Sequence, residues 1–110
     1  MKQLILIVLL LFCTSCQHTD WNQINKRIIN EFDMGDIKLH YTVKINSRMK
    51  RKGFEHDNVI TLRSENVSKS VKIHEVAHNA LKAYIKKYGD VPLIVHELFA
   101  QEVEKRLTSF

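Results

Sequence analysis

Residues 67–88 constrain the fold most, because they form one long segment with helical periodicity and contain neither glycine nor proline. Ser64 or Ser68 can cap the start of this segment, and Gly89 stands where a helix commonly ends in a left-handed residue. The sequence therefore predicts a helix over residues 67–88. A chain of 110 residues leaves room for only one small domain around that helix.

The faces of this predicted helix follow from placing each residue about 100° after the one before it. His74 and His78 fall inside the apolar arc, close to its border with a polar arc. The members of the polar arc are Lys72, Glu75, Asn79, Lys82 and Lys86.

The remaining elements complete a predicted α+β domain. Apolar residues at helical spacing predict a helix over residues 20–32, with Gly35 placed to end it. Strict alternation over residues 37–45 predicts a half-buried strand, and residues 58–64 are a second strand candidate. We expect these strands to pair as a hairpin with a long tip. A last helix from about Asp90 to Leu107 gives the order helix, strand, strand, helix, helix, with both late helices packed on a short sheet.

The N-terminal segment has the features of an export signal. Lys2 precedes an apolar run from Leu4 to Phe12, which is far shorter than the roughly 20 residues of a membrane-spanning helix. The following "TSC" resembles a bacterial lipoprotein signal in which Cys16 is lipidated. This resemblance implies a signal peptide over residues 1–15, a lipid-anchored tether and packing helix over 16–35, a domain over 36–110, and a membrane-anchored lipoprotein of the bacterial cell envelope. An uncleaved membrane anchor is the alternative.

The net charge of +5 is concentrated in residues 47–53, where Arg48, Lys50, Arg51 and Lys52 occur within five positions. One interpretation is a solvated loop tip, and another is contact with anionic lipid headgroups. An exported protein is not expected to bind nucleic acid.

The string "HEVAH", residues 74–78, carries the candidate chemistry. Histidines at positions i and i+4 of a helix project from one face, so both imidazoles can reach one zinc ion. Glu75 points to the side, where it can act as general base on a zinc-bound water. The alternative is that both histidines simply pack in a core, although buried imidazoles then need partners.

The H-E-x-x-H string is the signature of zincin metallopeptidases. "HEVAH", a gap of 18 residues and then "ELFAQ" resemble the glutamate-zincin pattern. That resemblance implies a zincin-like fold, Glu97 as third zinc ligand, and Gln101 at a position that often orients a histidine. Helix rise alone favours the level of Glu102 over that of Glu97 if the two helices run strictly antiparallel. His96 is a possible supporting residue.

These features predict a zinc-dependent metallopeptidase, a hydrolase of peptide or protein substrates. We expect the strand over residues 59–63 to offer its edge to an extended substrate. Two alternatives remain open. One is a non-catalytic exported lipoprotein with a structural or vestigial metal site, since glutamate zincins usually continue into further substrate-binding structure. The other is a membrane-surface binding module that uses residues 48–52.

Overall fold

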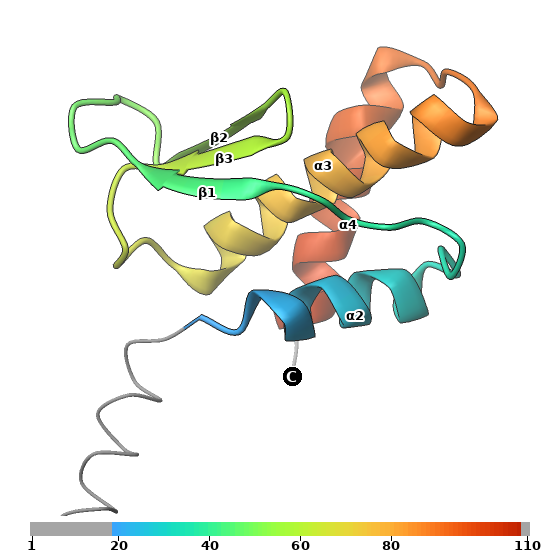
Figure 1. Ribbon diagram of the computed structural model, residues 1–110, viewed down its shortest axis with the longest axis horizontal. Helices are drawn as coiled ribbons and strands as arrows, with labels where there is room; N and C mark the ends of the chain where they lie inside the picture. Colours follow the sequence, from blue (N-terminus) through green and yellow to red (C-terminus); the bar gives the residue numbers. More distant parts are fainter. Residues whose placement is uncertain (1–18, 109–110) are drawn as a thin grey trace, which may run out of the picture.

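The computed structural model describes residues 19–108 and is a small α+β domain with three helices and a three-stranded mixed sheet (Figure 1). Helix α3 contacts β2 and β3 on one side and packs against α2 and α4 on the other. The expectation that α3 packs on a short sheet is confirmed. The elements are α2 (Trp21–Glu31), β1 (Thr42–Ile45), β2 (Gly53–His56), β3 (Val59–Leu62), α3 (Lys69–Tyr88) and α4 (Leu93–Thr108).

The expected position of α4 was wrong in one respect. Within residues 19–108, α4 packs on α3 and α2 and makes no contact with the sheet. Figure 1 shows the reason, since α4 turns back behind α3 and runs down toward α2, away from the strands. The sheet therefore covers only α3.

The predicted hairpin between residues 37–45 and 58–64 was also wrong. The strand order is β1-β3-β2, in which β1 runs parallel to β3 and β2 runs antiparallel to it. Asp57 and Asn58, both with φ near +60° (53° and 62°), form the two-residue turn that joins β2 to β3. Turns of this kind match the twist of antiparallel strands, so the local β2–β3 hairpin forms and β1 takes the other edge of β3.

Two further consequences follow from this pairing. β3 is the central strand, so its edges are both occupied and the expectation that residues 59–63 offer an edge to a substrate was wrong. The open edges belong to β1 and β2. β1 is limited to Thr42–Ile45 because β3 offers only four partner residues, although the alternating burial of residues 37–43 continues the predicted pattern.

Helix ends mostly follow local rules. The Ser68 side chain accepts a hydrogen bond from the Val71 N–H, and Gly89 has a φ of 111° at the end of α3, as predicted. Helix α2 is capped by Asp20 but ends at Glu31, before Gly35. The left-handed residue there is Asp33, with a φ of 53°, so the role expected of Gly35 was wrong.

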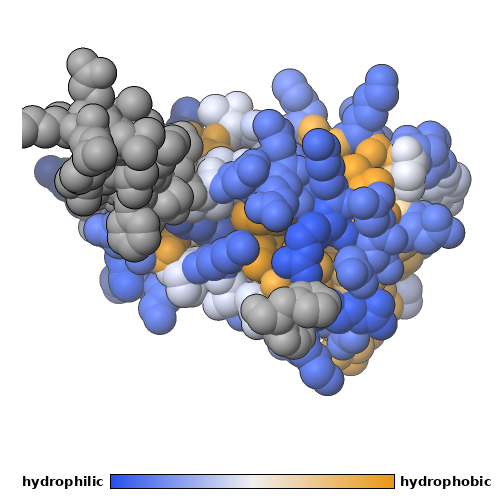
Figure 2. Space-filling view, turned by 90° about the horizontal axis from the view of Figure 1, so that it is seen from below, coloured by the Kyte–Doolittle hydropathy of each residue, from blue (hydrophilic) through white to orange (hydrophobic). Residues whose placement is uncertain are grey.

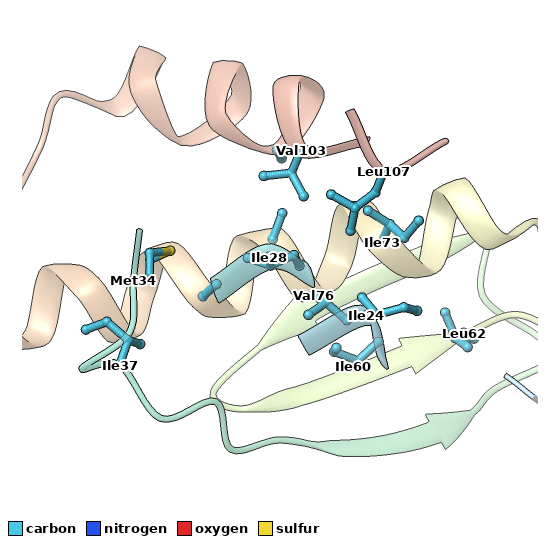
Figure 3. Close-up of a cluster of buried hydrophobic side chains, with 13 residues drawn as sticks. Ile24, Ile28, Met34, Ile37, Ile60, Leu62, Ile73, Val76, Val103 and Leu107 are labelled. Carbon is cyan, nitrogen blue, oxygen red and sulfur yellow. The ribbon is translucent and has the colours of Figure 1, made fainter. Parts of the chain in front are cut away.

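The core lies between α2, α3, α4 and the inner face of β3. Figure 3 shows Ile24 and Ile28 of α2 directed toward Ile73 and Val76 of α3. Burying each such side chain contributes about 1.5–3 kcal/mol to the stability of the fold. The helices enclose this core on one side and the sheet encloses it on the other. The other labelled core residues are Met34, Ile37, Ile60, Leu62, Val103 and Leu107.

The outer surface agrees with this arrangement. Seen from the α2 side, the face in Figure 2 is mostly hydrophilic, with scattered hydrophobic residues between the polar ones. Within residues 19–108, no helix has the length and apolar character that crossing a membrane requires.

The polar arc of α3 is partly buried. Lys72, Glu75 and Asn79 are all buried. Lys72 Nζ donates to Thr19 Oγ1 at 2.6 Å and to the Glu65 carbonyl at 3.0 Å. Partners from outside the helix thus satisfy groups that the helix alone would leave in solvent.

Candidate metal centre

His74 and His78 lie one turn apart on α3 and are both partly buried. Their rings meet edge to face with centroids 4.8 Å apart, and their Nε2 atoms are 3.2 Å from each other. Position i and i+4 side chains project from the same helix face, so this approach follows directly from the sequence spacing.

Glu97 of α4 faces both histidines. Its Oε1 lies 3.0 Å from His74 Nε2 and its Oε2 lies 3.4 Å from His78 Nε2. Ligand atoms bound tetrahedrally to zinc at about 2.0–2.1 Å are about 3.3 Å apart. The two Nε2 atoms have about this separation, and with one ligand atom from each residue His74, His78 and Glu97 all lie within 4.8 Å of one another, close enough to share a metal ion.

The tilt of α4 places Glu97, and not Glu102, beside the two histidines. Because α4 crosses behind α3 and is not strictly antiparallel to it (Figure 1), the start of α4 passes His74 and His78. Glu102 instead pairs with Arg106, four residues later on α4, at 2.9 Å. Within residues 19–108, the one group of histidine and acidic side chains close enough to share a metal is His74, His78 and Glu97.

Glu104, another acidic residue of α4, contacts His74 in a way that sequence reasoning did not assign to it. Its Oε2 lies 3.1 Å from His74 Nδ1. If a metal bound Nε2, a carboxylate at this distance would accept the proton of Nδ1–H and so orient the ring. We refer to His74, His78, Glu97 and Glu104 as the metal cluster.

The two residues expected to support the histidines lie elsewhere on α4. Gln101 is exposed, and the contact with His74 that was expected of it falls to Glu104. His96 is partly buried, and its Nε2 has no hydrogen-bond partner within the described part of the chain. The sequence feature that indicates the position of Glu104 is its spacing from Glu97. Glu104 follows Glu97 by two helical turns and so lies on the same edge of α4.

Glu75 is 8% exposed and lies under strand β2. A Cβ added at Gly53 would lie 3.1 Å from Glu75 Cγ and 3.4 Å from its Oε2, so the strand backbone approaches this side chain closely. Burial raises the pKa of Glu75, while the nearby His74 opposes that rise. A backbone hydrogen bond from Glu55 also holds the carboxylate.

Burial also acts on His78, whose pKa is lowered chiefly by desolvation and then by the charge of His74. A lowered pKa keeps the imidazole neutral, and the neutral form is the one that binds metals.

A second polar cluster ties the sheet to α3. The Glu55 carboxylate of β2 is fully buried, and its Oε1 lies 2.6 Å from Lys82 Nζ. Asn79 Nδ2 donates to Glu55 Oε2 and to Asn58 Oδ1, both at 3.0 Å. We refer to Glu55, Asn58, Asn79 and Lys82 as the Glu55 cluster. Sequence reasoning missed it because residues 46–57 were interpreted as the loop of a long hairpin.

The metal cluster opens into a cleft of about 580 Å³. One wall is α3 with Glu75, and the opposite rim is formed by β2 and the two residues before it, Arg51 and Lys52. The basic stretch thus borders the cleft. An open cleft with three potential ligands leaves room for water or a substrate beside a metal.

No family model, curated protein or solved structure matches this chain. The resemblance to glutamate zincins therefore rests on "HEVAH" and Glu97 alone. The expected lipidation site, Cys16, lies outside the described residues, as does the predicted signal peptide.

Proposed function

We propose that this protein is a zinc-dependent peptidase that hydrolyses peptide bonds, with a zincin-like site. The observation that carries the proposal is that His74 Nε2 and His78 Nε2 lie 3.2 Å apart and that each faces an oxygen of the Glu97 carboxylate, at 3.0 and 3.4 Å. These side chains would hold the ion, and Glu104 would fix the orientation of His74.

The donor set fits zinc. Two imidazoles and one carboxylate are the ligands of many catalytic zinc sites, whereas structural sites are usually closed by four protein ligands. When bound, zinc supplies a Lewis acid that lowers the pKa of a coordinated water to about 7 and polarises a carbonyl. The half-exposed Glu97 carboxylate, with 55% of its side chain accessible, supports a site open to substrate.

Glu75 is placed to move protons beside that site. Its side chain follows His74 in sequence but points toward β2, so it borders the cleft without joining the three potential ligands. A carboxylate that is held next to a metal yet does not ligate it can accept a proton from water and return it to the leaving amine.

The open edge of β2 supports a peptide substrate. The Arg63 N–H donates to the Lys52 carbonyl, and hydrogen-bonded pairs alternate along an antiparallel ladder. The backbone groups of Gly53 and Glu55 therefore face away from β3, toward the open edge, where the Glu55 N–H already donates to the Glu75 carboxylate and the others face a substrate. An extended peptide pairing there would pass directly in front of Glu75.

The test is a comparison of the full-length protein with Glu75→Gln. Glutamine has nearly the same size but cannot accept the proton, so zinc content should stay at about one ion per chain while peptide hydrolysis falls by at least about a hundredfold. Zinc is measured by elemental analysis and hydrolysis by mass spectrometry of a peptide mixture. Unchanged hydrolysis in the variant would remove Glu75 from the mechanism, and a folded zinc-binding protein that cleaves nothing would favour a purely structural metal.

We also propose that the protein is exported and held at a membrane by a lipid on Cys16. The support is the sequence "TSC" after a short apolar run. Incorporation of a labelled fatty acid that disappears in Cys16→Ala would be the expected result, and labelling that persists in this variant would contradict the assignment.

A further inference from the structure

Two cations stand at the rim of the cleft. Arg51 and Lys52 line it, directly before β2, and both side chains are exposed. They belong to the basic stretch of residues 47–53, for which the sequence did not indicate a single binding partner. Their position beside the metal cluster makes the cleft the nearest place for an anionic group to bind.

The acidic side chains of the cleft do not neutralise these cations. Glu55 pairs with Lys82 at 2.6 Å, and Glu97 and Glu104 both face His74, at 3.0 and 3.1 Å. Among residues 19–108, no carboxylate lies within ion-pair distance of Arg51 or Lys52. The fourth acid of the cleft, Glu75, accepts a hydrogen bond from the Glu55 backbone, so the rim cations are available to a ligand.

Arg51 is held in place by an aromatic contact. Its guanidinium carbon lies 5.6 Å from the centroid of Phe54, which stacks on His56 at 6.0 Å. Such a cation–π contact orients the guanidinium but leaves its hydrogen-bond donors available. A guanidinium presented in this way is suited to bidentate binding of a carboxylate.

The distance along the strand fits the proposed peptide path. Gly53 of β2 lies close to Glu75, since a Cβ there would stand 3.1 Å from Glu75 Cγ, and Lys52 and Arg51 are one and two residues before it. Residues of an extended strand are about 3.3 Å apart, so a peptide on the β2 edge has Lys52 and Arg51 within about two residues of the bond facing Glu75.

We infer that the cleft selects peptides that carry a carboxylate within about two residues of the cleaved bond, which Arg51 and Lys52 bind. The inference rests on the proposed function and names its substrate class. The carboxylate can belong to an aspartate or glutamate side chain or to the C-terminus of the peptide, since both offer the same two oxygens.

Three matched peptides separate these sources. One carries glutamate two residues from the cleaved bond and an amidated C-terminus. The second has glutamine there and remains amidated, and the third has glutamine but ends in a free carboxylate at the same distance. We expect the zinc-loaded full-length protein to cleave at least one acidic peptide with a kcat/KM about tenfold above the neutral one. The acidic peptide that is preferred identifies the source of the carboxylate.

Charge variants test the residues. In the double variant Arg51→Gln, Lys52→Gln the preference should fall to about onefold, because the charged partners are gone. The matched control Lys44→Gln, Arg48→Gln removes the same charge from exposed residues that do not line the cleft, and it should keep most of the preference. An equal loss in both double variants would mean a general effect of net charge and would overturn the assignment.

Binding provides a readout that does not depend on hydrolysis. Calorimetric titration of the Glu75→Gln protein should show about tenfold tighter binding of the acidic peptide, and the difference should shrink at high salt. Equal binding and equal cleavage of acidic and neutral peptides would refute the substrate class while leaving the peptidase intact. Selective binding without any cleavage would refute the proposed function and leave the recognition of carboxylates standing.

Discussion

The metal cluster and the Glu55 cluster lie next to each other along α3 and border the same cleft, and they differ in whether their charges are paired within the fold. In the Glu55 cluster, the buried carboxylate has a counter-ion in Lys82 and an amide donor in Asn79. In the metal cluster, two Nε2 atoms and a carboxylate converge within 3.4 Å and border an open cleft. The first arrangement is complete within the fold, whereas the second has the form of a binding site for a cation.

The largest effect is expected when the metal cluster loses a ligand. His78→Ala should weaken zinc binding by more than about a hundredfold, because only two ligands remain. The same change should alter the stability of the metal-free protein little, since His78 is only partly buried. Competition with a chromophoric chelator measures the affinity, with His40→Ala, at an exposed position, as the control. Equal affinities in the two variants would contradict the ligand assignment.

In the Glu55 cluster, a substitution should change the stability of the fold instead. Glu55→Ala leaves Asn79 buried without this acceptor and removes the counter-ion of Lys82. Because Lys82 is 44% exposed and can turn to solvent, we expect the free energy of unfolding to fall by only about 2 kcal/mol. Urea unfolding measures it.

The matched control for that change is Glu102→Ala, which breaks an exposed pair with Arg106 and should cost no more than about 0.5 kcal/mol. If the two glutamate variants were equally stable, the Glu55 cluster would have no structural role beyond that of a surface ion pair.

Glu104→Gln should separate orientation from ligation. Glutamine can still contact His74 Nδ1 but brings no charge, so zinc affinity should fall by about tenfold while the ligands stay the same. Gln101→Ala, on the exposed side of α4, should leave the affinity unchanged. A larger loss in Gln101→Ala than in Glu104→Gln would restore the sequence-based expectation for position 101.

The smallest of the predicted effects is expected for Tyr41, whose hydroxyl makes a polar contact outside both clusters. Burial raises the pKa of Tyr41 to about 12, despite the hydrogen bond that its hydroxyl donates to Asn25. A raised folded-state pKa means that this contribution to stability is complete below about pH 10 and is lost as pH rises toward 12. The ring is partly exposed, so the loss should not exceed about 1 kcal/mol.

Urea unfolding between pH 9 and 12 checks this, with Tyr41→Phe as the comparison that lacks the titrating group. A stability curve of Tyr41→Phe that falls as steeply as that of the unchanged protein would show that other groups cause the loss.

The parts of the fold that could be predicted are those set by neighbours in sequence. Ser68 and Gly89 mark the ends of α3 because capping and left-handed residues act within one helical turn. Strand β2 could not be found in this way, since its four residues gain their structure by pairing with β3 across the Asp57–Asn58 turn. The Asp57–Asn58 turn was the sequence feature that could have indicated the β2–β3 hairpin.

The same distinction, between features set by sequence neighbours and features set by distant parts of the chain, applies to the candidate site. His74 and His78 could be predicted because a spacing of four residues fixes their common face. Glu97 came from a family resemblance, which also gave Gln101 the role that Glu104 has. Glu75 and Asn79 were assigned to the polar arc of the helix, and β2 covers them because it brings Gly53 and Glu55 from another part of the chain. Helical periodicity does not show which face a distant strand covers.

The most direct test of the metal cluster is zinc X-ray absorption spectroscopy of the full-length protein after zinc loading. The structure predicts one zinc per chain with two imidazole nitrogens and carboxylate oxygen at about 2.0–2.1 Å, and a weakened imidazole signal in His78→Ala. Zinc with no imidazole ligands, or a folded protein that binds no zinc, would contradict the site and with it the proposed activity.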